Sequence, residues 1–215
     1  MNKRSEKKGR IPILIGLALI LAALLLTGYN FWDGYRAQRA ADAVLAVLEP
    51  LITGDPAEIY RETMGDPDET EYPDYILNPE MEMPAKTVNG HDFVGILQMP
   101  TLGRTFPIGS EWNYTNLKTG PCRYDGTPYL NNMIICAHNY RPQFGTIKNL
   151  KMGDPVIVRD MDGNVFEYQV IEIEILSPHD VERMKAGEWD LTLFTCTVGA
   201  GSRVTVRCEL VPQEL

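Results

Sequence analysis

A long apolar segment directly behind a basic N-terminus is the feature that most restricts this chain. Residues 11–26 read IPILIGLALILAALLL, and the stretch stays uncharged through Trp32. A bilayer core of about 30 Å is crossed by roughly 20 helical residues. The segment therefore predicts a transmembrane helix over residues 11–32, preceded by a basic tail of residues 1–10.

The charges around this segment predict its orientation. The first ten residues carry five basic side chains and one acidic side chain, a net charge of +4. The whole chain carries −9, so the remainder carries −9 less +4, which is −13. Basic residues flank membrane helices on the cytoplasmic side, so we expect a cytoplasmic tail and an exported remainder.

A cleaved signal peptide is the alternative interpretation of the same segment. Its apolar region would span about 7–15 residues and end at a small-residue cleavage site. Here the apolar run is longer, and the bulky residues Tyr29, Phe31 and Trp32 follow it. The sequence therefore favours an uncleaved, single-pass anchor with an interfacial aromatic belt.

The composition of the exported part excludes some functions. An acidic body lacks the basic face that nucleic-acid binding requires. Hydrophobic residues make up 44% of the chain, which is enough for a packed core and excludes wholesale disorder. The length of 215 residues fits one globular domain with additions.

Residues 33–86 read as a stalk between the anchor and this domain. Ala37–Ile52 has the apolar spacing of an amphipathic helix that ends near Pro50. From Asp55 to Glu82 there are ten acidic residues and one basic residue, with four prolines, which predicts an extended acidic linker. A second possibility is that part of this linker covers a groove of the domain as a lid.

Residues 87–215 predict an all-β domain. Several short apolar or alternating segments with frequent Gly and Pro between them indicate a closed β-barrel. Asp162-Gly163 is a hairpin signal, and one short helix is expected over residues 178–185 with Ser177 as its N-cap. The predicted strands are Phe93–Met99, Asn131–Ala137, Val156–Arg159, Val165–Ile175, Leu191–Thr195 and Arg203–Val211.

Three side chains at the ends of predicted strands form a candidate acyl-transfer site. Cys196 ends one strand, Arg203 begins the next, and His138 follows the strand ending at Ala137. A thiolate is a strong nucleophile, an imidazole can transfer protons to and from an amine, and a guanidinium can stabilise an oxyanion. Taken alone, the pattern also fits a packed core cysteine and a surface histidine.

Several motifs resemble those of the sortases, the membrane-anchored transpeptidases of Gram-positive bacteria. The segment TLFTC at residues 192–196 resembles the family signature TLxTC, and ICAHN at 135–139 resembles the strand that ends in Gly-His-Asn or Gly-His-Arg, with Ala137 in place of Gly. The resemblance covers roughly residues 90–211 and keeps the order His, Cys, Arg. Further matches are Gly95–Pro100, Phe144-Gly145, Leu150–Asp154 and Ser202–Val206.

The resemblance implies a sortase-type closed β-barrel of about eight strands with short helices. It assigns Cys196 as the nucleophile, His138 as the general acid and base, and Arg203 as the oxyanion or substrate-positioning group. Arg207 is the rival for the arginine role, because residues four apart on a strand share a face. Thr195 is expected to support the site or simply to pack.

The implied substrate is a secreted protein with a C-terminal sorting signal such as Leu-Pro-x-Thr-Gly. The implied acceptor is an amine, from a lipid-linked cell-wall precursor or a pilin lysine. No metal or cofactor is required, although calcium assists some relatives. The Ala-His-Asn motif leans toward the class B branch. The expected location is the cell membrane, with the catalytic domain outside.

Three other assignments fit the sequence less well. An L,D-transpeptidase places Arg two residues after Cys, whereas here the gap is seven. Peptidoglycan peptidases usually place Cys before His, and a non-catalytic binding barrel would not need the triad. His91 and His179 are expected at the surface, without metal-ligand spacing. Cys122, Cys136 and Cys208 allow one disulfide at most, or they are buried thiols.

Overall fold

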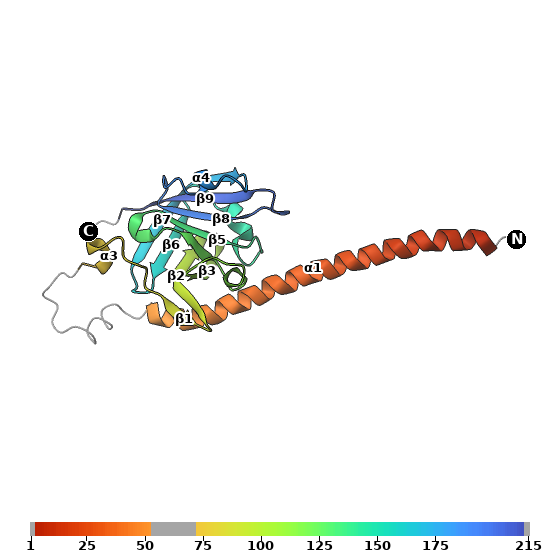
Figure 1. The fold of residues 1–215 in the computed structure, drawn as a ribbon, viewed down its shortest axis with the longest axis horizontal. Helices are drawn as coiled ribbons and strands as arrows, with labels where there is room; N and C mark the ends of the chain where they lie inside the picture. The colour runs from red at the N-terminus through yellow and green to blue at the C-terminus, as the bar shows by residue number, and fades with distance from the viewer. Residues whose placement is uncertain (1–2, 53–71, 213–215) are drawn as a thin grey trace. The chain divides into compact units, whose positions relative to one another are not determined.

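The computed structural model describes residues 3–52 and 72–212. The chain divides into two compact units, Met1–Arg36 and Ala37–Leu215, which are described separately. Most of the acidic segment predicted as a linker, residues 55–71, lies outside the described residues. Figure 1 shows the order of the helices and strands along the chain.

The first unit consists of the N-terminal part of helix α1 (Lys3–Ile52). This helix is long and apolar enough to cross a membrane. Its large apolar side chains are exposed rather than buried, from Ile13 to Leu26. A helix in the core of a globular domain would bury these side chains. This part of α1 is therefore a candidate membrane span.

The end of α1, from Ala37 onward, belongs to the second unit and packs on its barrel. Val44, Leu45, Leu48 and Ile52 repeat at helical spacing and are buried in one cluster. The barrel residues in that cluster are Val88, Phe93 and Ile96. The helix ends two residues after Pro50, as the sequence predicts. The amphipathic segment therefore covers one side of the barrel.

The second unit is a closed barrel of eight strands, which confirms the predicted all-β fold. The strands are hydrogen-bonded in the order β2-β3-β4-β5-β8-β9-β7-β6, and β6 pairs back with β2 to close the sheet. The short β1 (Lys86–Val88) extends β2 as a hairpin. The barrel strands are β2 (His91–Met99), β3 (Arg104–Gly109), β4 (Cys122–Asp125), β5 (Met133–Ala137), β6 (Pro155–Asp160), β7 (Val165–Leu176), β8 (Leu191–Cys196) and β9 (Arg203–Leu210).

The barrel interior is filled by alternate residues of the strands. Along β9, Val204, Val206 and Cys208 belong to the main core cluster, so Arg203 and Arg207 point to the outer face. On β5, Met133, Ile135 and Ala137 are in the same core. The outer face of β5, β8 and β9 is therefore available to build a site.

Two local predictions were wrong. The short helix α4 (Val181–Met184) is capped by Asp180, whose carboxylate accepts a hydrogen bond from the Arg183 amide, and not by Ser177. Residues 72–82 are not an extended linker, because they include helix α3 (Asp74–Leu77). Tyr75 from this helix stacks on Tyr129 at a centroid distance of 4.9 Å.

The buried Cys208 thiol predicts that the free energy of unfolding falls at alkaline pH. Cys208 is fully buried, and burial raises its pKa above the usual range. Above about pH 8.5 the unfolded chain releases this proton while the folded chain keeps it, so stability falls as pH rises. We expect Cys208→Ala to reduce that slope by about 1.4 kcal/mol per pH unit. Urea unfolding of the reduced protein at pH 8 and pH 10 measures it, and equal slopes would contradict it.

Candidate active site

Cys196 and Arg203 are cross-strand partners at the end of the β8–β9 hairpin. The two residues lie directly opposite each other in the antiparallel register, so their Cα atoms are about 4.5–5.5 Å apart. The turn between them is closed by the Thr197 amide, which donates to the Ser202 carbonyl at 2.9 Å. Both side chains are half-buried, so the hairpin presents a thiol and a guanidinium side by side.

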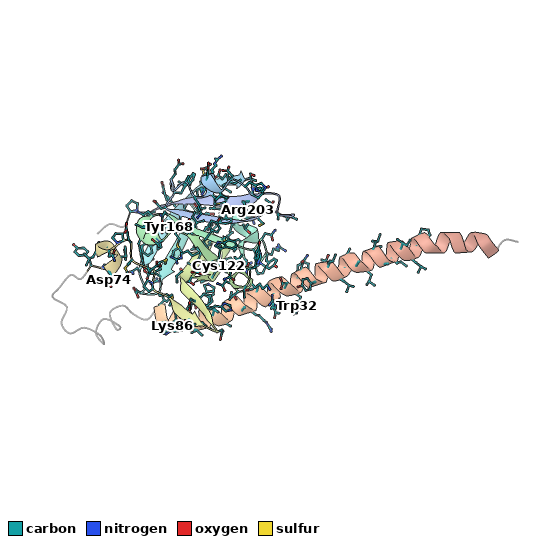
Figure 2. The ribbon with its side chains drawn as sticks, in the orientation of Figure 1. Trp32, Asp74, Lys86, Cys122, Tyr168 and Arg203 are labelled. Atoms are coloured by element: carbon teal, nitrogen blue, oxygen red, sulfur yellow. The ribbon has the colours of Figure 1, made fainter. Side chains whose placement is uncertain are left out.

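The Arg203 guanidinium is held by the backbone of this same turn. Its Nη1 donates to the Ala200 carbonyl at 3.3 Å and to the Ser202 carbonyl at 3.2 Å. Two such contacts leave further N–H groups of the guanidinium for a ligand, since arginine carries five donors. Figure 2 labels Arg203 at the start of β9.

His138 reaches the same place from the neighbouring strand. In the parallel β5–β8 register Ala137 lies opposite Thr195, and each is followed by a candidate site residue. The Thr195 hydroxyl donates to the Ala137 carbonyl at 2.8 Å, and the Asn139 amide donates to the Thr197 carbonyl at 3.2 Å. These bonds on either side of His138 fix its loop to the Cys196 strand.

The three predicted residues line one groove of about 260 Å³ on the outer face of the barrel. Its surface is mainly apolar and aromatic, and much of it comes from loops. Trp112 and Tyr114 contribute from the segment after β3, and both are exposed. Tyr124 packs edge-on against Phe194 at 5.2 Å, across the width of β5. The groove can therefore hold an extended apolar segment beside the thiol.

The loop between β7 and β8, residues 177–190, forms one wall of this groove. Arg207 holds this loop through hydrogen bonds to its backbone and a contact with its Trp189 ring. Its Nη2 donates to the Arg183 carbonyl at 2.9 Å, its Nη1 donates to the Met184 carbonyl at 3.3 Å, and Trp189 lies over the guanidinium at 3.8 Å. In the same loop, Lys185 forms an ion pair with Asp125 of β4.

The burial of Arg207 separates the two arginines that the sequence could not fully distinguish. Arg207 has no exposed surface, and its Nε forms a 3.0 Å ion pair with Glu174. Burial lowers the pKa of the Arg207 guanidinium, and Glu174 opposes that shift. Only Arg203 is among the residues that line the groove. Arg207 is therefore a scaffold residue.

The other candidates lie elsewhere. His91 Nδ1 is hydrogen-bonded to Asn116 at 2.9 Å, and His179 is exposed. Neither lines the groove. Within residues 3–52 and 72–212, no three His, Cys, Asp or Glu side chains are grouped so that they could hold a metal ion.

Sequence reasoning missed the groove walls and one positioning glycine. Gly145 lies under the loop that follows His138, and its amide donates to the Tyr140 carbonyl at 2.9 Å. A Cβ at this position would lie 2.5 Å from the Asn139 oxygen and 2.7 Å from the Tyr140 oxygen. Both are backbone atoms, so the loop itself would have to move. The sequence shows the Phe144-Gly145 pair as a motif but gives no physical reason for the glycine.

We therefore expect Gly145→Ala to impair the site rather than the fold. A displacement of about 1 Å at a catalytic group can cost roughly 10²-fold in rate. Peptide-transfer kinetics measure this effect, with unfolding midpoints recorded in parallel. Gly28→Ala is the matched control, because a Cβ there meets nothing within 4 Å. A Gly145→Ala protein with unchanged kcat/KM would contradict the positioning role.

Comparison with known proteins agrees with this architecture. The sortase domain family matches residues 97–211, more than half of the chain. Sortase A of Bacillus anthracis is 23% identical over 195 residues, which cover 88% of each chain. The chain has the fold of Streptococcus pneumoniae sortase C (TM-score 0.55, 20% identity, 80% of this chain and 97% of that one). It also has the fold of Clostridium perfringens sortase C, solved with the C-terminal cell wall sorting motif (TM-score 0.51, 23% identity, 80% and 91%).

The family match, the barrel and the arrangement of β5, β8 and β9 agree with one another. The comparisons include proteins named sortase A and sortase C, so they identify the family and no class within it. The chain belongs to the sortase family of transpeptidases.

Proposed function

We propose that this sortase cleaves an LPXTG-like sorting signal through a thioester on Cys196 and transfers the acyl group to an amine. The observation that carries the proposal is the register pairing of Cys196 with Arg203 in a groove that His138 also lines. A nucleophile, a proton carrier and a cation in one groove are the parts that acyl transfer needs.

In the proposed reaction the Cys196 thiolate, with His138 protonated, attacks the carbonyl carbon of the Thr residue in the sorting motif. The C–N bond to Gly breaks, and His138 gives its proton to the leaving amine. The incoming amine then attacks the thioester, loses a proton to His138 and releases the thiolate. Arg203 donates hydrogen bonds to the oxyanion or holds the substrate carbonyl in both halves.

The apolar groove supports the substrate class. Trp112, Tyr114 and Tyr124 offer surfaces for a Leu-Pro pair, and Cys196 lines the same groove. The C. perfringens relative is described with a cell wall sorting motif, and the S. pneumoniae work concerns pilin substrate specificity. We extend binding of a cell wall sorting motif to this chain, with a cell-wall precursor or a pilin lysine as the amine. No metal is used, and calcium would at most assist.

The location proposed for the enzyme follows from α1. Its apolar part would span the membrane of a Gram-positive cell, with the basic tail in the cytoplasm. The barrel would then face the outside, where secreted sorting signals and wall precursors occur. An enzyme in this position is anchored through a single helix and meets its substrates as they leave the membrane.

The test is transfer of a labelled peptide by the full chain in detergent. A peptide containing Leu-Pro-Glu-Thr-Gly should be cleaved between Thr and Gly and joined to an added amine such as triglycine. Mass spectrometry identifies the product, and a peptide with Ala in place of the Pro is the substrate control. Absence of any acyl-enzyme or product across varied motifs would contradict the proposal.

A further inference from the structure

Two of the remaining cysteines lie opposite each other in the sheet behind the groove. Cys122 in β4 and Cys136 in β5 are direct partners in the antiparallel register. Opposed residues have Cα atoms about 4.5–5.5 Å apart and side chains on one face. That distance lies inside the range of 4.4–6.8 Å spanned by natural disulfides.

These two thiols are separate from the barrel interior. Cys122 and Cys136 form a small cluster with Leu117 on the outer face, whereas Cys208 belongs to the main core. Cys136 also lines the groove that contains Cys196. In the structure all four cysteines are thiols. The geometry therefore selects one pair among the three cysteines that the proposed reaction does not use.

The pair joins the barrel strand that has the fewest register pairs to its neighbours. Strand β4 has four residues, one register pair to β3 and three register pairs to β5 that are interrupted by an irregularity. The same strand carries Tyr124, which lines the groove, and Asp125, the ion-pair partner of Lys185. A covalent link from β4 to β5 would therefore hold that wall of the groove in place.

We propose that Cys122 and Cys136 form a cross-strand disulfide that staples β4 to β5 and leaves Cys196 free to react. The proposal rests on the proposed export of the barrel, because disulfides persist in oxidising compartments. The two thiols lose two protons and two electrons to a small-molecule disulfide, and one S–S bond forms. With oxidised glutathione, two molecules of reduced glutathione are released.

The burial of the pair indicates when the bond forms. Burial raises the pKa of Cys136 to about 12, and burial and the neighbouring Cys136 raise the pKa of Cys122 above its usual range. Exchange proceeds through the thiolate, so the folded protein oxidises slowly. The bond therefore forms as β4 and β5 come together during folding outside the cell.

The experiment refolds the full chain in detergent with a mixture of reduced and oxidised glutathione. Free thiols are then alkylated in denaturant, and peptides are mapped by mass spectrometry without reduction. We expect a Cys122–Cys136 linked peptide, with Cys196 and Cys208 alkylated. The Cys208→Ala protein should give the same linked peptide. Alkylation of both Cys122 and Cys136, or a bridge that includes Cys196, would overturn the proposal.

A stability measurement gives an independent readout. The bridge closes a short loop, so oxidised protein should unfold roughly 10 °C above reduced protein. Cys122→Ser should remove this difference between oxidising and reducing buffers. An unchanged midpoint in oxidised, bridged wild type would overturn the stapling role. Peptide transfer by the reduced wild type tests the proposed function separately, so failure of either claim is distinguishable from failure of the other.

Discussion

Cys196→Ala should lose sorting-peptide transfer by roughly 10³-fold or more, because the substitution removes the sulfur on which the proposed thioester forms. The substitution removes one sulfur from a half-buried position at a strand end, so the fold should be retained. Unfolding midpoints within about 2 °C of wild type would show that the loss is chemical. Intact mass spectrometry should detect an acyl-enzyme in wild type and none in the variant.

Cys136→Ala is the matched control for this experiment. Cys136 lines the same groove, but it is buried, and burial together with nearby Cys196 raises its pKa to about 12. Few thiolates are present at neutral pH at such a site. The control should keep its transfer activity within a few-fold of wild type. A Cys196→Ala protein with full activity, or an acyl group found on Cys136, would contradict the assignment of the nucleophile.

Much of the barrel could be predicted from local pattern. Segments such as Val165–Leu176 alternate in hydrophobicity and have clear breakers on both sides, and each became a strand. The sequence did not reveal β3 and β4. Strand β3 contains Pro107, and β4 has four residues, two of them charged. Both strands are held by their neighbours in the closed sheet, and pairing of this kind overrides weak local preference.

The candidate site could be predicted from the sequence only in part. Cys196 and Arg203 flank one hairpin, so their closeness follows from sequence distance alone. The closeness of His138 depends on the parallel β5–β8 pairing, which no local pattern in the sequence shows. The groove walls depend on loops that meet from distant parts of the chain, such as Tyr114 and Val181. No pattern within either segment shows this meeting.

Arg203→Met should impair catalysis with little change in stability, whereas Arg207→Met should impair stability with little change in kcat. Comparing the two variants is therefore the sharpest test of the site. Arg203→Met should lower kcat by about 10²–10³-fold, the usual cost of losing an oxyanion donor. Its bonds to two turn carbonyls are partly exposed, so the change in stability should be below about 1 kcal/mol. Arg207→Met should instead lower stability by about 3 kcal/mol, or roughly 6–12 °C.

The large effect expected at Arg207 comes from the hydrogen bonds and the ion pair that its guanidinium makes. Its removal leaves the Arg183 and Met184 carbonyls without their donor and takes one of two cations from Glu174. The wall loop would then loosen, so the folded fraction of Arg207→Met should show a raised KM while retaining much of its kcat. Urea unfolding and transfer kinetics at 15 °C separate the two quantities. A kcat loss confined to Arg207→Met, with Arg203→Met unaffected, would reverse the assignment, because a catalytic cation must touch the substrate whereas a scaffold cation acts only through the loop it holds.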